Sequence, residues 1–112
     1  MAGKIEIYKD KKGEYRFRLK SSNGENILGS EGYKRKSSAV NGAASVEKNC
    51  ADASCFIKNK TPGGKYRFNM KSRNHKVIGV SQNYNSEAAC DNGIQAVARA
   101  AKGAKIVDLT QA

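Results

Sequence analysis

The sequence lacks the features that define several classes of protein. Its three cysteines, Cys50, Cys55 and Cys90, are an odd number without CxxC spacing, and His75 is the one histidine. A disulfide framework and a zinc site are therefore not expected, and the thiols fit a reducing compartment. No apolar core of a signal peptide is seen at the start, and no apolar run approaches the roughly 20 residues that span a bilayer. We therefore expect a cytoplasmic protein without a membrane segment.

Acidic residues are also scarce. Ten Asp and Glu face 21 Lys and Arg, which gives the 112 residues a formal net charge of +11. The length suits one domain or two very small repeats, and it is too short for a doubly wound cofactor-binding enzyme. The carboxylates are scattered, His75 falls in a polar turn, and no glycine-rich phosphate-binding motif is present. We expect no catalytic residue, no cofactor and no metal ligand.

The chain contains an internal duplication. The triplet Tyr-Arg-Phe at residues 15–17 recurs at residues 66–68, an offset of 51. The same offset gives 14 identities in the 38 positions from residue 9 to residue 46, without a gap. Such self-similarity indicates two copies of one unit. We place the first repeat at residues 1–52 and the second at 53–112, and we expect one compact domain because no flexible linker separates them.

Each copy carries patterns typical of β-strands. Tyr15, Phe17 and Leu19 alternate with basic residues, which predicts a strand with one apolar and one basic face. The second copy repeats this alternation, and turns that contain glycine separate the strands. The predicted strands span residues 4–9, 14–20, 26–30, 54–60, 65–71, 76–82 and 104–109.

An amphipathic helix follows in each copy, over residues 36–49 and 86–101. The apolar stripe of the first helix ends at Cys50, and that of the second includes Cys90. Both thiols are therefore expected to be small core residues. Cys55 falls on a strand and has no evident activating partner, so a nucleophilic role is not expected.

Ser86 is a good N-cap for the second helix, whereas the first helix has Arg35 at this position. Gly42 and Gly93 recur inside the helices, where glycine is unfavourable. Their recurrence favours close packing of the helices on the sheet, with a kink as the alternative. The tyrosine before each helix is expected to pack rather than to bind a ligand.

The segment at residues 54–59 has two roles. It follows the first helix as residues 105–110 follow the second, and it also matches residues 5–8 at the start of the first repeat. One strand therefore serves both copies. We predict an α+β fold in which two β-β-β-α-β repeats form one continuous, mainly antiparallel sheet, with both helices on one face and a shared or swapped strand.

The repeated motifs resemble those of the YegP-like family, small bacterial proteins of uncharacterised function. The matching motifs are Tyr-Arg-Phe-x-Leu/Met-Lys, Asn-x-x-x-Ile, the tyrosine before each helix and Asn-Gly-Ile/Ala-x-Ser/Ala-Val, and they cover essentially the whole chain. The resemblance implies one sheet with swapped C-terminal strands, formed by dimerisation in single-unit members and within one chain in tandem members. Lys58 departs from the pattern, because Ile7 predicts an apolar residue there. The resemblance brings no established activity with it.

Charge is the one functional signal. Residues 1–51 carry +5 and residues 52–112 carry +6, so both copies share it. Many of the cations fall on the strand face opposite the core aromatics, where they are expected to form a basic patch that contacts phosphates. The helix N-terminus after residues 34–36 offers free N–H groups for an anion. The candidate contacts are Arg16, Arg18, Lys20, Arg67, Lys71, Lys34, Arg35 and Lys36.

Several interpretations of this charge stay open. The cations either keep a half-exposed sheet solvated or bind nucleic acid without sequence specificity. Base stacking is not expected, because the strand aromatics share the phase of the core residues and Tyr8 alone falls on the other phase. The second functional hypothesis is a non-enzymatic protein-interaction or stress-associated module that recognises an acidic partner. Under either hypothesis we expect a monomer. An enzyme comes third, and a deep pocket lined by polar groups of both halves would favour it.

Overall fold

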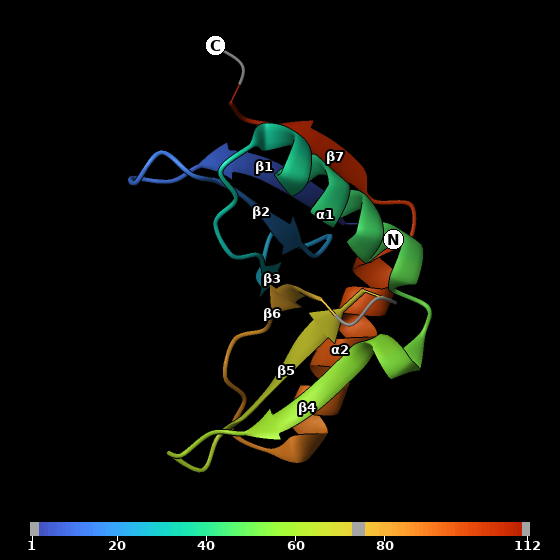
Figure 1. Ribbon diagram of the computed structural model, residues 1–112. Helices are drawn as coiled ribbons and strands as arrows, with labels where there is room; N and C mark the ends of the chain where they lie inside the picture. Colours follow the sequence, from blue (N-terminus) through green and yellow to red (C-terminus); the bar gives the residue numbers. More distant parts are fainter. Residues whose placement is uncertain (1–2, 73–75, 111–112) are drawn as a thin grey trace.

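The computed structural model describes residues 3–72 and 76–110 (Figure 1). Its elements follow the chain in the order β1 (Lys4–Lys9), β2 (Tyr15–Lys20), β3 (Asn26–Gly29), α1 (Lys36–Asn49), the short 3-10 helix η1 (Ala53–Cys55), β4 (Phe56–Lys60), β5 (Tyr66–Lys71), β6 (Val77–Val80), α2 (Glu87–Ala101) and β7 (Lys105–Asp108). The sequence pattern did not predict η1.

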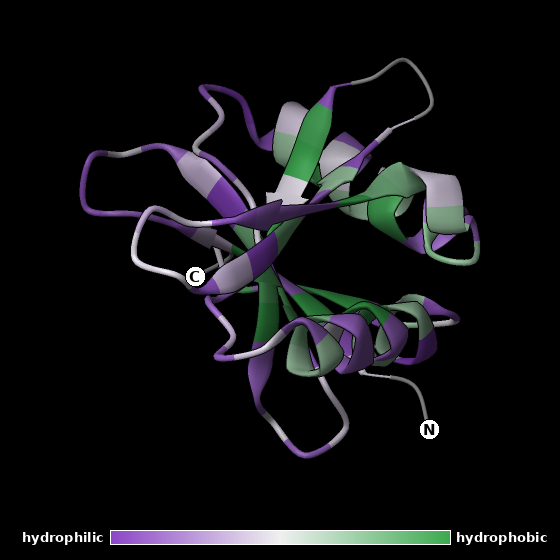
Figure 2. Cartoon of the chain, turned by 90° about the horizontal axis from the view of Figure 1, so that it is seen from below, coloured by the Kyte–Doolittle hydropathy of each residue, from purple (hydrophilic) through white to green (hydrophobic). Residues whose placement is uncertain are grey.

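All seven strands join one sheet in the order β4-β5-β6-β3-β2-β1-β7. Every neighbouring pair is antiparallel except β1 and β7, which are parallel. Both helices pack on the inward face of the strands, because their buried residues join those of the strands in one core cluster. Figure 2 shows the hydrophobic segments of the strands toward the middle of the molecule. The predicted α+β fold with one continuous, mainly antiparallel sheet is confirmed.

The two repeats meet at the centre of the sheet. The register between β3 and β6 pairs Gly29 with Val80, and these two residues are equivalent at the repeat offset of 51. A pseudo-two-fold axis therefore passes through this pair. The strands on either side of it, β2 and β5, and then β1 and β4, are related in the same way.

The two strands that follow the helices have different partners. β7 follows α2 and pairs in parallel with β1, so the last strand of the second repeat completes the edge of the first, as the swapped arrangement predicts. β4 follows α1 but pairs antiparallel with β5, in the way that β1 pairs with β2. Within residues 3–72 and 76–110, no strand lies beside β4 as β7 lies beside β1. β4 therefore takes the role of a first strand and leaves one edge of the sheet free.

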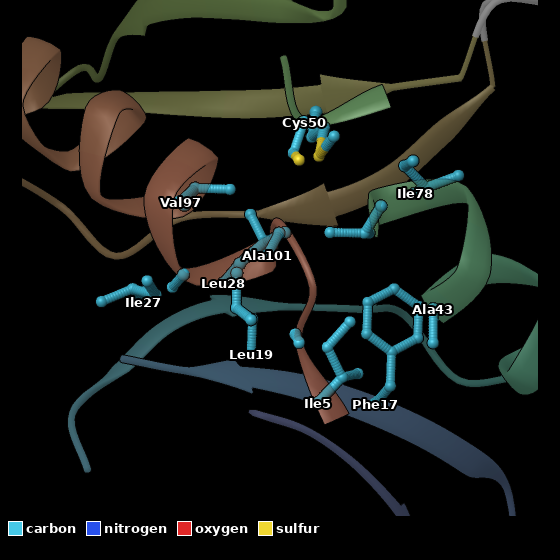
Figure 3. Packing of buried hydrophobic residues seen from close by; sticks show 14 of the residues in the cluster. Ile5, Phe17, Leu19, Ile27, Leu28, Ala43, Cys50, Ile78, Val97 and Ala101 are labelled. Carbon is cyan, nitrogen blue, oxygen red and sulfur yellow. The ribbon is translucent and has the colours of Figure 1, made fainter. Parts of the chain in front are cut away.

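The core lies between the sheet and the two helices (Figure 3). Each helix packs on strands of both repeats, α1 on β1, β2 and β6, and α2 on β5, β1, β2 and β3. Alternate residues of β1, β2 and β5 point into this layer and are fully buried, as their spacing predicts. The largest buried side chains are Phe17, Phe68, Ile5, Ile7, Leu19, Met70, Val46, Val97 and Cys90.

The interior glycines of the helices allow the tyrosines to approach. A Cβ atom on Gly42 would lie 2.8 Å from Phe17 Cε2 and 3.1 Å from the Tyr33 hydroxyl oxygen, and one on Gly93 would collide with the Tyr84 hydroxyl. Both tyrosines pack against the core. The prediction of close packing is therefore confirmed. Phe17 and then Tyr33 lie nearest to Gly42, and Tyr84 lies nearest to Gly93.

The helix ends and the thiols follow the sequence pattern. Ser86 Oγ accepts a hydrogen bond of 3.1 Å from the Ala89 amide, whereas Arg35 makes no side-chain cap. Gly103 has φ +70°, as a residue that ends a helix requires. Cys50 and Cys90 are buried in the core, and burial raises the pKa of both thiols.

Candidate nucleic-acid interface

The strand cations gather on the face of the sheet away from the helices, which we call the outer face. The strand register puts Arg18 beside Glu6 and Lys20 beside Lys4, opposite in phase to the buried Leu19. Lys105 pairs with Lys4 and lies on the same face, a neighbour that only the β1–β7 pairing reveals. The outer-face cations are Lys4, Arg16, Arg18, Lys20, Arg67, Lys71 and Lys105.

Glu6 lies at the centre of the cations from the first repeat. Arg18 Nε donates to Glu6 Oε1 at 2.7 Å, and the Lys20 and Lys4 ammonium groups each lie 3.4 Å from this carboxylate. Glu6 is only 6% exposed, because these long side chains cover it. The hydrogen bonds from Arg18 and Lys20 together outweigh burial and lower the pKa of Glu6. The carboxylate of Glu6 therefore neutralises part of the positive charge of the first repeat.

Asp10 holds a second cation of this half. Arg16 Nε donates to Asp10 Oδ2 at 2.7 Å, and Arg16 also donates to the Ser30 carbonyl oxygen. The amides of Lys12 and Glu14 donate to Asp10 Oδ1, which ties the carboxylate to the turn between β1 and β2. The bond from Arg16, followed by that from Glu14, lowers the pKa of Asp10. The guanidinium of Arg16 is thus fixed in place.

Tyr8 is the aromatic residue of the first strand that faces outward, as its phase predicts. The guanidinium carbon of Arg18 lies 4.5 Å from the centre of the Tyr8 ring. This cation–π contact covers the ring. The outer face of the first repeat therefore offers cations rather than an open aromatic surface for base stacking.

The second repeat carries a different set of side chains at the equivalent positions. Ile57 replaces Glu6 and Thr61 replaces Asp10 at the offset of 51. Arg67, which is exposed, and the half-buried Lys71 therefore have no equivalent of the two carboxylates that hold the cations of the first repeat. In the described part of the chain, neither forms an ion pair. Arg67 and Lys71 are thus not held by carboxylates in the way that Arg18 and Arg16 are.

The three cations before the first helix do not extend the outer face. Lys36 forms an ion pair with Asp108, which by the β1–β7 register shares the inward phase of the buried Ile7. Lys34 and Arg35 are exposed and lie in the loop that leads to α1. That loop pairs with Tyr15, whose phase is that of the core. Lys36 therefore pairs with a residue of the inward phase rather than with the outer face, and a contact of these three cations with an anion stays a prediction.

Other candidate chemistry can be placed only in part. His75 and Arg73 lie outside the described residues, and Cys55 is buried. Among the residues described, no three His, Cys, Asp or Glu side chains gather as a metal site. In the same part of the chain, no helix has the length and apolar character needed to cross a bilayer.

The fold and the outer face together define a class: a tandem α+β repeat protein whose two units share one sheet with a basic face. The family model described as "Domain of unknown function (DUF1508)" matches the chain twice, over residues 10–56 and 63–108. The chain belongs to this family. The resemblance to YegP-like proteins is confirmed, and the two matches agree with the duplication.

Similar proteins match over nearly their full length. The "UPF0339 protein in ptx operon 5'region" of Stutzerimonas stutzeri is 50% identical over 109 residues, which are 97% of this chain and 98% of the relative. The solution structure of a UPF0339 protein of Shewanella oneidensis has a TM-score of 0.91 at 43% identity, covering 97% of this chain and 92% of that one. The structure of yegP from E. coli, described as a protein of unknown function, has a TM-score of 0.93 at 38% identity, covering 100% and 97%. None of these descriptions names an enzymatic activity.

Proposed function

We propose that the outer face binds the phosphates of nucleic acid without sequence specificity. The supporting observation is the distribution of charge: seven cations lie on a face that neither helix covers, with Glu6 and Asp10 as the carboxylates that contact them. An anionic backbone that crosses the sheet meets cations of both repeats. Attraction of this kind is electrostatic and does not depend on the base sequence.

The two halves have different parts in this proposal. Arg16 and Arg18 are held by carboxylates, so a phosphate that binds them must compete with Asp10 and Glu6. Arg67 and Lys71 meet no such competition. They are the main phosphate contacts, and the cations of the first repeat act as secondary ones. The protein acts as a non-enzymatic, monomeric binding protein of the cytoplasm.

The test is the salt dependence of binding. Fluorescence anisotropy with a labelled 30-base-pair duplex and a 30-nucleotide single strand, from about 50 to 200 mM salt, is expected to show affinity that falls linearly on a log–log plot. R67E/K71E is expected to weaken binding at least about tenfold and to reduce the slope by about two, because each phosphate contact contributes roughly 0.9 to it.

A matched control separates this surface from net charge. R99E/K102E makes the same charge change at exposed positions at the end of α2 and is expected to keep the affinity within about threefold. Equal weakening by both variants contradicts the outer face as the site. Absence of salt-dependent binding to both nucleic acids contradicts the function, and an acidic protein partner then becomes the leading hypothesis.

A further inference from the structure

Two related clefts lie between a helix of one repeat and a turn and strand of the other. The α1 cleft, about 710 Å³, is lined by α1 and by residues at both ends of the turn that joins β5 to β6. The α2 cleft, about 240 Å³, is lined by α2 and by the turn that joins β2 to β3. Ile78 borders the first and Ile27 the second, and the two are repeat equivalents. Both clefts are formed by equivalent elements of the two repeats, so their chemical differences come from the side chains that line them.

The charge of the two clefts differs. Lys48 and Lys76 line the α1 cleft, and none of the described residues that line it is acidic. At the equivalent positions of the α2 cleft stand Arg99 and Glu25, one of each sign. Lys48 and Lys76 are both exposed. The α1 cleft therefore attracts anions, whereas the α2 cleft is balanced.

The helix side of the two clefts also differs. Ser45 and Asn49 line the α1 cleft, where the α2 cleft has Ala96 and Ala100. Asn49 is 4% exposed, so a polar amide is buried where the other repeat buries a methyl group. Asn49 Nδ2 donates to the Ser45 carbonyl oxygen at 2.9 Å and to Ser45 Oγ at 3.1 Å. Within residues 3–72 and 76–110, Asn49 Oδ1 has no hydrogen-bond partner.

The hydrogen bond to the Ser45 carbonyl oxygen fixes the orientation of the Asn49 amide, so the atom without a partner is the oxygen and not the nitrogen. If the amide were turned over, Oδ1 would face the Ser45 carbonyl oxygen, and two acceptors would repel each other. A buried acceptor without a partner is unfavourable, and alanine at the equivalent position shows that the fold does not require an amide there. Ser45 Oγ accepts from Asn49, which leaves the Ser45 hydroxyl proton free to donate to an anion.

We propose that the α1 cleft binds a small phosphorylated hydroxy compound of sugar-phosphate size. Its phosphate lies between Lys48 and Lys76, and one of its hydroxyl groups donates to Asn49 Oδ1. The volume falls in the range of ligand sites, which the α2 cleft does not reach. Because Oδ1 is sheltered from solvent, binding includes a small shift of the side chains around Asn49.

The test compares three probes on the full chain at constant ionic strength. Isothermal titration calorimetry is expected to show glucose 6-phosphate binding about tenfold more tightly than inorganic phosphate, and glucose binding not at all, since each polar contact contributes about one power of ten. K48A/K76A is expected to weaken glucose 6-phosphate at least about tenfold. The matched pair E25A/R99A, in the equivalent cleft, is expected to leave the affinity unchanged.

A second variant tests the buried amide. N49A is expected to bind glucose 6-phosphate no better than inorganic phosphate and to keep the wild-type affinity for the latter. Its amide proton NMR spectrum checks the fold, and Ala100 shows that alanine fits this position. Unchanged discrimination in N49A, equal losses in the two cleft double variants, or no binding of either phosphate overturns the proposal. R67E/K71E is expected to bind glucose 6-phosphate normally, which separates this site from the outer face.

Discussion

The Tyr84 hydroxyl occupies the space that a methyl group on Gly93 would need, and the Phe17 ring and the Tyr33 hydroxyl crowd the same space at Gly42. Each tyrosine is also tied to a strand by two backbone hydrogen bonds, Tyr33 to Tyr15 and Tyr84 to Tyr66. The loop before each helix therefore fixes the ring, and the ring in turn fixes how near the helix lies. Sequence reasoning found the glycine and the tyrosine separately. Their contact became visible only in three dimensions.

G93A is expected to lower the free energy of unfolding by about 1–3 kcal/mol, the usual cost of an added methyl group in a packed site. This loss comes despite the better helix propensity of alanine, about 1 kcal/mol. The measurement is urea unfolding followed by circular dichroism. In a Y84F background, which removes the atom nearest to the new methyl group, the loss from G93A is expected to shrink. An equal loss in both backgrounds would show that the hydroxyl is not the obstacle.

Asp108 gives the protein a defined response to acid. Lys36 pairs with this carboxylate, and the Thr110 hydroxyl and amide donate to its Oδ1 at 2.5 and 2.8 Å. These bonds, that of Lys36 first, lower the pKa of Asp108 to about 2. Because the folded pKa lies below the usual value of about 3.9, the contribution of Asp108 is complete above pH 4 and is lost as the pH falls toward 2.

K36M is therefore expected to raise the pKa of Asp108, as measured by NMR titration of the side-chain carboxyl carbon. D108N is expected to show a weaker dependence of stability on pH between 4 and 2 than the wild type. K36Q, at the same position and also uncharged, serves as a control for the loss of side-chain length. A pKa for Asp108 that stays near 2 in K36M would exclude Lys36 as its main cause.

At the scale of the elements, the periodicity of the sequence predicted which faces of the strands are buried better than it predicted which strands pair. The alternation of Phe17 and Leu19 with cations set the two faces of β2 correctly. It did not reveal that the register between β2 and β3 shifts after Leu19, which pairs with Leu28. On β3 the consecutive residues Ile27 and Leu28 are both buried. Two adjacent buried residues do not fit a period of two. Nor does any local pattern show that β7 lies beside β1, because that contact joins the two ends of the chain.

The free edge at β4 is protected by an unusual lysine. Lys58 has the inward phase of Phe56, and its ammonium group lies 2.8 Å from Asp91 and 3.8 Å from Glu87, both on α2. The bond to Asp91 raises the pKa of Lys58. An inward lysine on an edge strand disfavours pairing with another chain, because the pairing would bury the charge. The position of Lys58 on an edge strand thus explains why a lysine replaces the apolar residue expected there.

K58I, which restores the apolar residue found at position 7, is expected to associate through β4 at concentrations where the wild type is monomeric. Sedimentation velocity at several protein concentrations measures this. K65I, an equal change in the turn after β4, is the control, because it adds an apolar side chain outside any strand. Association of both variants would point to surface hydrophobicity alone, and association of neither would exclude β4 as a sticky edge.

For the whole molecule, the main consequence of the duplication is a shared core. Each helix packs on strands of both repeats, and Val46 on α1 and Val97 on α2, equivalent residues, are fully buried in one cluster. The repeats visible in the sequence are therefore not independent folding units. The absence of a linker in the sequence predicted a single sheet. That each helix packs on strands of both repeats could be seen only in the structure.

The chain is accordingly expected to unfold in one transition. V46A and V97A are each expected to lower the midpoint of urea unfolding, by about 2 kcal/mol in free energy, without changing the slope of the transition. Circular dichroism and tyrosine fluorescence are expected to report the same midpoint. Two transitions, each shifted by only one of the variants, would show that the repeats unfold separately.

The sequence predicted which cations share one face of the sheet, but not which of them are neutralised by carboxylates. The phase of the strands placed Arg16, Arg18 and Arg67 on the face away from the core, where the structure also has them. The neutralising contacts of Glu6 and Asp10 depend on strand register and on the shape of a turn, which composition does not contain. The replacement of Glu6 by Ile57 in the second repeat was readable in the sequence. Its effect became evident once the pairs were known.

The pairing of β1 with β7 also bears on the order in which a newly made chain becomes complete. Lys4 pairs with Lys105, so nearly the whole polypeptide separates the partners. A ribosome makes the strands of the first repeat long before it makes β7, and contacts of such long range form slowly. Until then β1 exposes the backbone groups that β7 later pairs. A nascent chain that stops before residue 105 therefore has two open edges, β1 and β4, and only the first of them is closed by translation of the last strand.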